Sequence, residues 1–106
     1  MSQMTANGCI QSDSPSTFTA IFMLTSGQQA TFIGSFVPSV QTFICDTATL
    51  TYTNEDDLIS SRDFSGPLGS NDFTLTFTNN VIISGTLNQP IFPPNNIAGD
   101  GFWTIP

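Results

Sequence analysis

The side chains that could do chemistry in this chain are carboxylates, one tyrosine, one arginine and two thiols. The sequence has no histidine and no lysine, and its only basic residue is Arg62. Without histidine, Ser-His-Asp and Cys-His catalytic arrangements and histidine-built zinc sites are excluded. Without lysine, a Schiff base and a phosphate loop of the P-loop type are excluded as well. Any catalysis would therefore depend on carboxylates, Tyr52, Arg62 or a metal ion.

One acidic stretch is a candidate calcium site. Asn54-Glu55-Asp56-Asp57 supplies the hard oxygen ligands that calcium prefers. The run from Asp56 to Ser61 resembles the short calcium signature of βγ-crystallin domains, in which two Asp or Asn residues and two spacers precede Ser/Thr and Ser. The similarity occurs once, and Arg62-Asp63 follow where that family has a hydrophobic strand, so no family is assigned. The resemblance implies Asp56, Asp57 and Ser61 as ligands, and a solvated acidic loop is the alternative.

A second candidate site lies near the end of the chain. Trp103 follows Asn95 and Asn96 by a few residues, and an aromatic ring can stack on a sugar while amides bind its hydroxyls. A tryptophan that plugs the core is the alternative. A Phe-lined pocket that binds an apolar substrate would instead use Tyr52 or Arg62 as a polar handle.

The two cysteines, Cys9 and Cys45, can form one disulfide, within a chain or between chains. Two buried free thiols are the alternative, because cysteine packs well in a core. Neither residue has a basic neighbour in sequence that would stabilise a thiolate, so a reactive cysteine is not expected.

The charge balance limits the partners that the chain can bind. Only 8% of its residues are charged, against about 25% in an average domain, and the net charge is −7. Nucleic acids and anionic membranes are bound by clustered Lys and Arg, so neither is an expected partner. No apolar run is long enough to span a bilayer. Residues 1–9 lack the basic and apolar regions of a signal peptide, and the compartment is not assigned.

Strands must position these residues. Phe73, Leu75 and Phe77 alternate with threonines before Asn79-Asn80, which predicts a β-hairpin over 72–87. The same alternation recurs over 17–25, 30–37 and 47–53, and no window has helical periodicity. The sequence predicts a single antiparallel all-β domain over 17–106, with seven to eight short strands and no substantial helix. A sandwich or jelly roll and a small barrel are both compatible with this pattern.

Two segments depart from the alternation. Residues 1–16 are polar and small, which suggests an N-terminal arm. Residues 54–71 hold Arg62 and half of the acidic residues, and we expect a long irregular segment there.

The leading functional hypothesis is a non-enzymatic structural subunit that assembles into a homo-oligomer through the arm and exposed strand edges. Its basis is the near absence of the charged side chains that usually protect strand edges, together with apolar residues, such as Ile21 and Met23, on an expected outer face. The alternative is a lectin-like module that binds carbohydrate or another neutral ligand, with calcium as a possible aid. The third hypothesis is a small barrel enzyme with a Phe-lined pocket.

Overall fold

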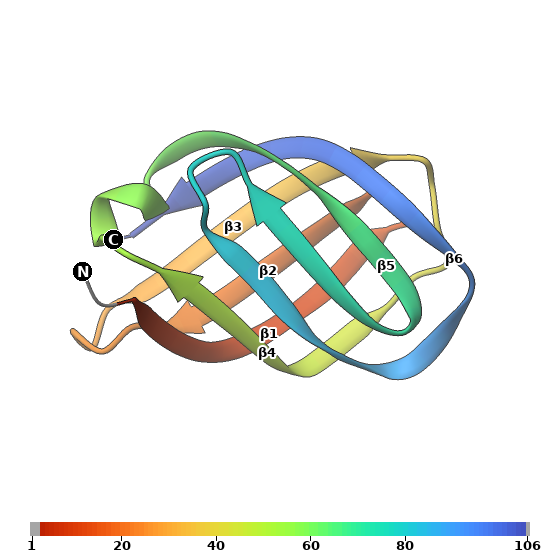
Figure 1. The fold of residues 1–106 in the computed structure, drawn as a ribbon, viewed down its shortest axis with the longest axis horizontal. Helices are drawn as coiled ribbons and strands as arrows, with labels where there is room; N and C mark the ends of the chain where they lie inside the picture. Colours follow the sequence, from red (N-terminus) through yellow and green to blue (C-terminus); the bar gives the residue numbers. More distant parts are fainter. Residues whose placement is uncertain (1–2, 106) are drawn as a thin grey trace.

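Antiparallel strands make up nearly all of the structure (Figure 1). The structure is a computed structural model and describes residues 3–105. Its elements, in chain order, are β1 (Met4–Ser14), β2 (Thr17–Met23), β3 (Gln29–Val37), β4 (Ile44–Tyr52), the 3₁₀ helix η1 (Glu55–Leu58), β5 (Ser60–Phe77) and β6 (Ile82–Thr104). Every pairing between these strands is antiparallel. The all-β antiparallel prediction is confirmed, and η1 is the only helical element in the described part of the chain.

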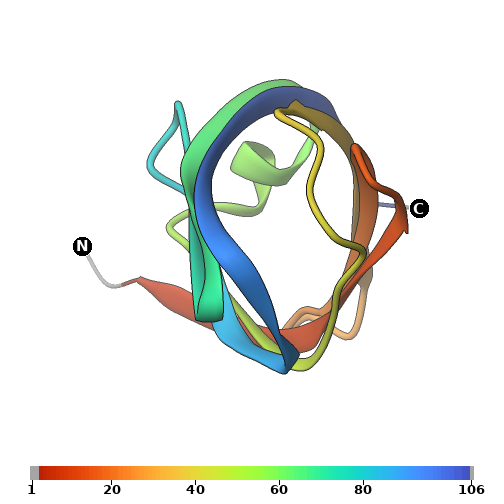
Figure 2. The same cartoon turned by 90° about the vertical axis from the view of Figure 1, so that its right-hand side faces the viewer.

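The six strands form one sheet that returns on itself. The strand order is β3-β2-β1-β4-β6-β5, and β3 also pairs with β6. Figure 2 shows the strands following one another around a central axis. β5 and β6 each reverse direction near their middle (Figure 1). As a result, the first part of β6 pairs with β4 and its last part pairs with β3.

The hairpin predicted over 72–87 is present. Asp72–Thr76 pairs with Ile82–Thr86, and the Phe77 amide donates to the Val81 carbonyl at 2.8 Å. Asn80 has a φ of 69° in the turn, a backbone conformation that asparagine tolerates better than most residues. The alternation of apolar and threonine side chains and the Asn-Asn turn therefore predicted the hairpin correctly.

The segments at 1–16 and 54–71 belong to the sheet over most of their length. β1 pairs with β2 on one side and with β4 on the other, so Met4–Ser14 does not extend from the domain as an arm. The expected irregular segment is wrong from Ser60 onward, because β5 begins there. Its inward positions carry Phe64 and Leu68, both buried. The charged pair Arg62-Asp63 before Phe64 and the Gly66-Pro67 pair after it hid that alternation.

Aromatic rings fill the interior. Phe32 is at the centre of the cluster, with ring centroids of Phe77 and Trp103 at 4.9 Å and of Phe18 and Phe64 at 5.7 Å. Two glycines make room for it. A Cβ at Gly34 would lie 2.7 Å from the Phe32 ring, and a Cβ at Gly101 would lie 2.6 Å from it. The aromatic core and the two glycines thus depend on each other.

Candidate ligand-binding groove

Outward-facing side chains of four neighbouring strands form two parallel rows over this core. The first, which we call the polar row, consists of Thr17, Ser35, Asp100 and Asp63, each opposite the next in register. The second row consists of Thr19, Ile33, Phe102 and Ser61. We call it the apolar row because Ile33 and Phe102 lie at its centre. Residues two apart on a strand share a face, so the rows run side by side about 7 Å apart.

Two hollows lie along these rows. The first has a volume of about 390 Å³ and is lined by Ser16, Ser35, Phe36, Val37, Ser39, Ala98, Gly99 and Asp100. The second has a volume of about 420 Å³ and is lined by Thr17, Ile33, Gly34, Ser35, Ser61, Asp100, Gly101 and Phe102. Because both are lined by Ser35 and Asp100, we treat them as one feature, the outer groove.

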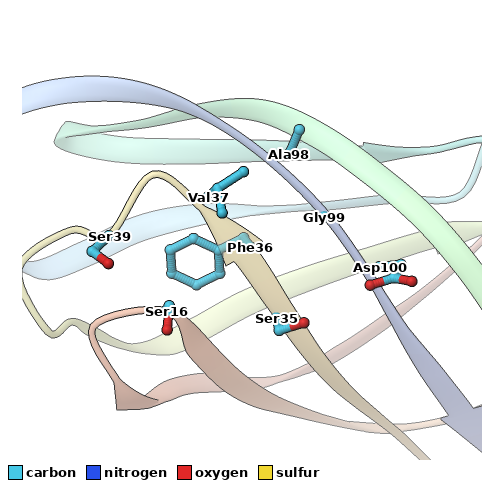
Figure 3. Close-up of a pocket in the computed structure, with 8 residues that line it drawn as sticks. All are labelled: Ser16, Ser35, Phe36, Val37, Ser39, Ala98, Gly99 and Asp100. Carbon is cyan, nitrogen blue, oxygen red and sulfur yellow. The ribbon is translucent and has the colours of Figure 1, made fainter.

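Figure 3 shows the residues that line the first hollow, with their hydroxyl and carboxylate oxygens in red. Ser35 on β3 and Asp100 on β6 lie on adjacent strands, and Ser16 and Ser39 lie toward the other end of the hollow. The second hollow adds the side chains of Ile33 and Phe102. Their exposed fractions are 58% and 59%, which is high for large apolar residues. The outer groove therefore combines hydroxyls, a carboxylate and an accessible aromatic ring.

The charged side chains of the polar row, Asp63 and Asp100, are both negative, and Asp100 is the one that lines the outer groove. Asp63 and Asp100 are directly opposite in register, an arrangement that places their Cβ atoms about 5 Å apart and is unfavourable for like charges. No hydrogen bond or ion pair within residues 3–105 involves either carboxylate. Arg62 is next to Asp63 in sequence, but its Nη1 donates to the Ser61 carbonyl at 3.2 Å instead. The negative charge of the polar row is therefore not compensated by any side chain of residues 3–105.

The sugar-stacking residues predicted from the sequence do not come together. Trp103 is only 1% exposed and packs against Phe32 and Phe77. Asn95 pairs with Leu68 and Trp103 pairs with Ser60, so they lie at opposite ends of the first uninterrupted part of the ladder between β5 and β6. Eight residues of extended strand separate them, which is about 26 Å. Asn96 adjoins Asn95 at the far end.

Tyr52 and Arg62 do not line a common hollow. Tyr52 is 1% exposed at the end of β4, and its hydroxyl has no hydrogen-bond partner in the described structure. Arg62 lies on β5, where its Nε is buried and also lacks a described partner. Neither side chain borders the outer groove.

The predicted calcium ligands lie on two elements. Asp56 and Asp57 are in η1, whose first turn is capped by Asn54 through its side-chain oxygen and the Asp56 amide at 3.2 Å. Ser61 lies on β5, opposite Phe102. Among residues 3–105 no group of three or more His, Cys, Asp or Glu side chains is placed to hold a metal ion.

The two cysteines are described as free thiols. Ile10, not Cys9, is the partner of Cys45 in the ladder between β1 and β4. Neighbouring residues of a strand point to opposite faces, so Cys9 is exposed while Cys45 is fully buried. Cys9 borders a third hollow of about 560 Å³, together with Asn7, Gly8, Asp46, Thr47 and Ala48. The Asp46 carboxylate there already accepts a hydrogen bond from Asn88 at 2.9 Å.

The comparisons with known proteins give no further guide to the site. No protein-family model matches the chain, and the searches of curated proteins and of solved structures found no match. Within residues 3–105, no helix has the length and apolar character needed to cross a membrane.

Sequence reasoning missed the residues of the outer groove for one reason. The alternation already places Ile33 and Ser35 on the face opposite Phe32, and it places Asp100 and Phe102 on one face of the last strand. The pairing of β3 with β6 brings these two sets together. That pairing joins distant parts of the chain, and no local pattern in the sequence indicates it.

Proposed function

We propose that this protein is a non-enzymatic, lectin-like module that binds carbohydrate in the outer groove. The observation that carries the proposal is the position of the apolar row directly beside the polar row. A pyranose ring has an apolar face of C–H groups and a rim of hydroxyls, so its two kinds of surface match the two rows.

The side chains of the groove suit such a ligand. Phe102 offers an accessible aromatic face for stacking, and Ile33 extends that apolar surface on the neighbouring strand. The Asp100 carboxylate can accept hydrogen bonds from ligand hydroxyls, and hydrogen bonds to a charged acceptor are the stronger kind. Ser35 can both donate and accept. A hollow of this size, with an apolar lining and a few placed polar groups, is typical of small-molecule binding sites.

The proposal is tested by titrating the ¹⁵N-labelled protein with neutral oligosaccharides of glucose, mannose, galactose and N-acetylglucosamine. We expect amide shifts at Ser35, Gly101 and Phe102 with at least one of them, and we expect Phe102→Thr to weaken that binding about tenfold or more. Repeating the titration with calcium and with a chelator shows whether Asp56 and Asp57 take part.

Phe92→Thr is the matched control, because Phe92 is also largely exposed but lies outside the groove. It should leave binding unchanged. If no oligosaccharide shifts the groove amides, or if Phe92→Thr and Phe102→Thr weaken binding equally, the outer groove is not a carbohydrate site.

Self-association is the second candidate function, and the same apolar residues favour it. Ile33 and Phe102 face each other across β3 and β6, and Ile21 lies on the neighbouring strand β2. β1 to β4 each pair with a strand on either side, so the support for an oligomer comes from these outer side chains rather than from strand edges. A contiguous exposed apolar patch often marks a protein–protein interface.

Light scattering with and without reductant separates the two candidates. A mass of twice 11.4 kDa or more that returns to the monomer in the double variant Ile33→Thr/Phe102→Thr would establish self-association through this face. Loss of the larger species on reduction alone would assign the contact to Cys9. A monomer under both conditions rules out the self-assembling subunit.

We further infer that the sheet is a small closed barrel rather than a sandwich. The pairing of β3 with β6 supports this reading, as does the reversal of β5 and β6, which counts as eight short strands if each is divided in two. A barrel of that size is filled by its own side chains, as the aromatic cluster around Phe32 illustrates. For this reason we place the ligand on the outside of the barrel.

A further inference from the structure

The end of the fold next to η1 contains buried polar atoms that the outer groove does not use. Arg62 Nε, Asn79 Oδ1 and Trp103 Nε1 are buried there, and none has a hydrogen-bond partner among residues 3–105. We propose that these three atoms form an internal binding site for ordered water, in which one water molecule bridges Arg62 and Asn79. The site is separate from the outer groove, which lies on the other face of the same strands.

The register of β5 and β6 places two of these side chains close together. Arg62 is opposite Gly101 and Trp103 is opposite Ser60, so Arg62 and Trp103 are diagonal neighbours, typically about 7–8 Å apart. Arg62 also precedes the buried Phe64 by two residues, which puts it on the inner face with Trp103. Arg62 therefore points into the fold, although it is the only basic residue of the chain.

Asn79 approaches Arg62 from the other side. The turn after β5 is bonded to the start of the same strand, since the Thr78 amide donates to the Asp63 carbonyl at 3.1 Å. The two halves of β5 also meet through an inner aromatic pair, whose ring centroids are 5.5 Å apart. One step beyond that pair, toward η1, Arg62 and Asn79 lie beside each other. Their buried donor and acceptor face the same region without bonding to each other.

η1 closes this end of the fold. Its Leu58 is fully buried, and Figure 2 shows η1 within the outline of the ring of strands. The Asn79 Nδ2 group donates to the Asp57 carbonyl at 3.0 Å. A carbonyl can only accept, so this bond fixes which end of the Asn79 amide faces η1. The Asn79 oxygen must then find its donor elsewhere.

The chemistry of the three atoms favours water over an anion. Arg62 Nε and Trp103 Nε1 can only donate, whereas Asn79 Oδ1 can only accept. A water molecule can serve both kinds of atom, but a carboxylate ligand has no proton to donate to Asn79. The net charge of −7 also repels anions. Internal water molecules typically make about three hydrogen bonds to buried polar groups, and three such atoms are available at this site.

The experiment detects the water directly on the intact ¹⁵N-labelled protein. We expect water-selective NMR to show a nuclear Overhauser effect between a long-lived water and the Hε protons of Arg62 and Trp103. Titration with formate should leave both signals in place. Absence of the effect overturns the proposal, and so does a saturable shift of the Arg62 signal with formate, which would indicate an anion site.

Two variants separate the water site from the order of η1. Asn79→Leu removes the acceptor together with the bond to η1, and it should abolish the effect at Arg62 Hε. Asn54→Ala is the control, because it removes the side-chain oxygen that accepts from the Asp56 amide and caps η1, but it keeps the acceptor. The effect should persist in this variant. Its loss in both variants, or its persistence in Asn79→Leu, contradicts the bridge between Arg62 and Asn79.

A crystal structure of the unchanged chain tests the site without any variant, and it decides the question if Asn79→Leu fails to fold. We expect a water molecule within hydrogen-bond distance of both Arg62 Nε and Asn79 Oδ1. A direct bond between these two atoms, or an anion in place of the water, overturns the proposal.

Discussion

The inner and outer faces of β3 and β6 are built from alternate residues of the same two strands, yet they differ in solvent exposure and in the contacts of their side chains. Trp103 and Phe102 are neighbours in sequence, but the first is 1% exposed and the second 59%. On the inner face, the rings of Phe32, Phe77 and Trp103 are in mutual contact. On the outer face, Phe102 has Ile33 and Ser61 as its cross-strand neighbours. The strand parity, and not the type of side chain, decides which aromatic residue supports the fold and which can meet a ligand.

The largest expected effect comes from replacing each of these two neighbours by alanine in turn. Trp103→Ala should lower the free energy of unfolding by about 3–5 kcal/mol, because it empties a site in a packed core. Phe102→Ala should change it by about 0.5 kcal/mol or less, as is usual for an exposed side chain. Urea denaturation of both variants measures the difference. Trp103→Phe keeps an aromatic ring and removes an indole N–H that has no described partner, so its cost should be smaller. Similar losses for Trp103→Ala and Phe102→Ala would contradict the assigned parity.

A smaller effect is expected from a side chain added at Gly101, between the outward-facing Asp100 and Phe102. A Cβ at Gly101 would clash with the Ile33 carbonyl oxygen and would lie 2.6 Å from the Phe32 ring. Gly101→Ala should therefore destabilise the protein by about 2 kcal/mol, within the usual range for overpacking. Ser35→Ala on the outer face is the control and should be nearly neutral for stability. A neutral Gly101→Ala would show that β3 and β6 can move apart at no cost.

The smallest effect concerns the polar row. Asp63→Asn removes one of two opposed carboxylates and should stabilise the protein by about 0.2–1 kcal/mol at low salt. The gain should shrink as salt screens the repulsion. Asp72→Asn, which has Thr86 opposite it, should give no comparable gain. Thermal unfolding at two salt concentrations measures both variants. Destabilisation by Asp63→Asn would mean that the carboxylate has a favourable partner.

The sequence predicted the periodicity of this fold much better than its pairings. Alternation and the Asn79-Asn80 turn were sufficient for the central hairpin, because both signals are local. They were not sufficient for β5, where Gly66 and Pro67 interrupt the alternation of Phe64 and Leu68. They also could not decide between Phe102 and Trp103, since two adjacent aromatic residues fit either parity. The register that opposes Phe32 to Trp103 settles that choice, and register depends on residues far apart in the chain.

The calcium and disulfide hypotheses show that the sequence also could not predict which functional groups lie together. Asp56, Asp57 and Ser61 are close in sequence, but a 3₁₀ turn and the start of a strand place them on different elements. Cys9 and Cys45 lie on paired strands, but with opposite parity. Residue types and spacing identified groups capable of the chemistry, and the orientation of each group came from the sheet.

The pairing of β3 with β6 also bears on how the chain reaches its structure. Thr31 pairs with Thr104 and Val37 with Ala98, so β3 cannot pair with β6 until the chain has been made as far as these residues. During synthesis, β1 to β4 emerge from the ribosome before β6, so one edge of β3 is unpaired at that stage. Unpaired strand edges are prone to pair with other chains. Closure through such distant residues also favours slow folding, on the scale of milliseconds to seconds. β6 therefore covers the strand edges of both β3 and β4, which would otherwise be open to pairing with other chains.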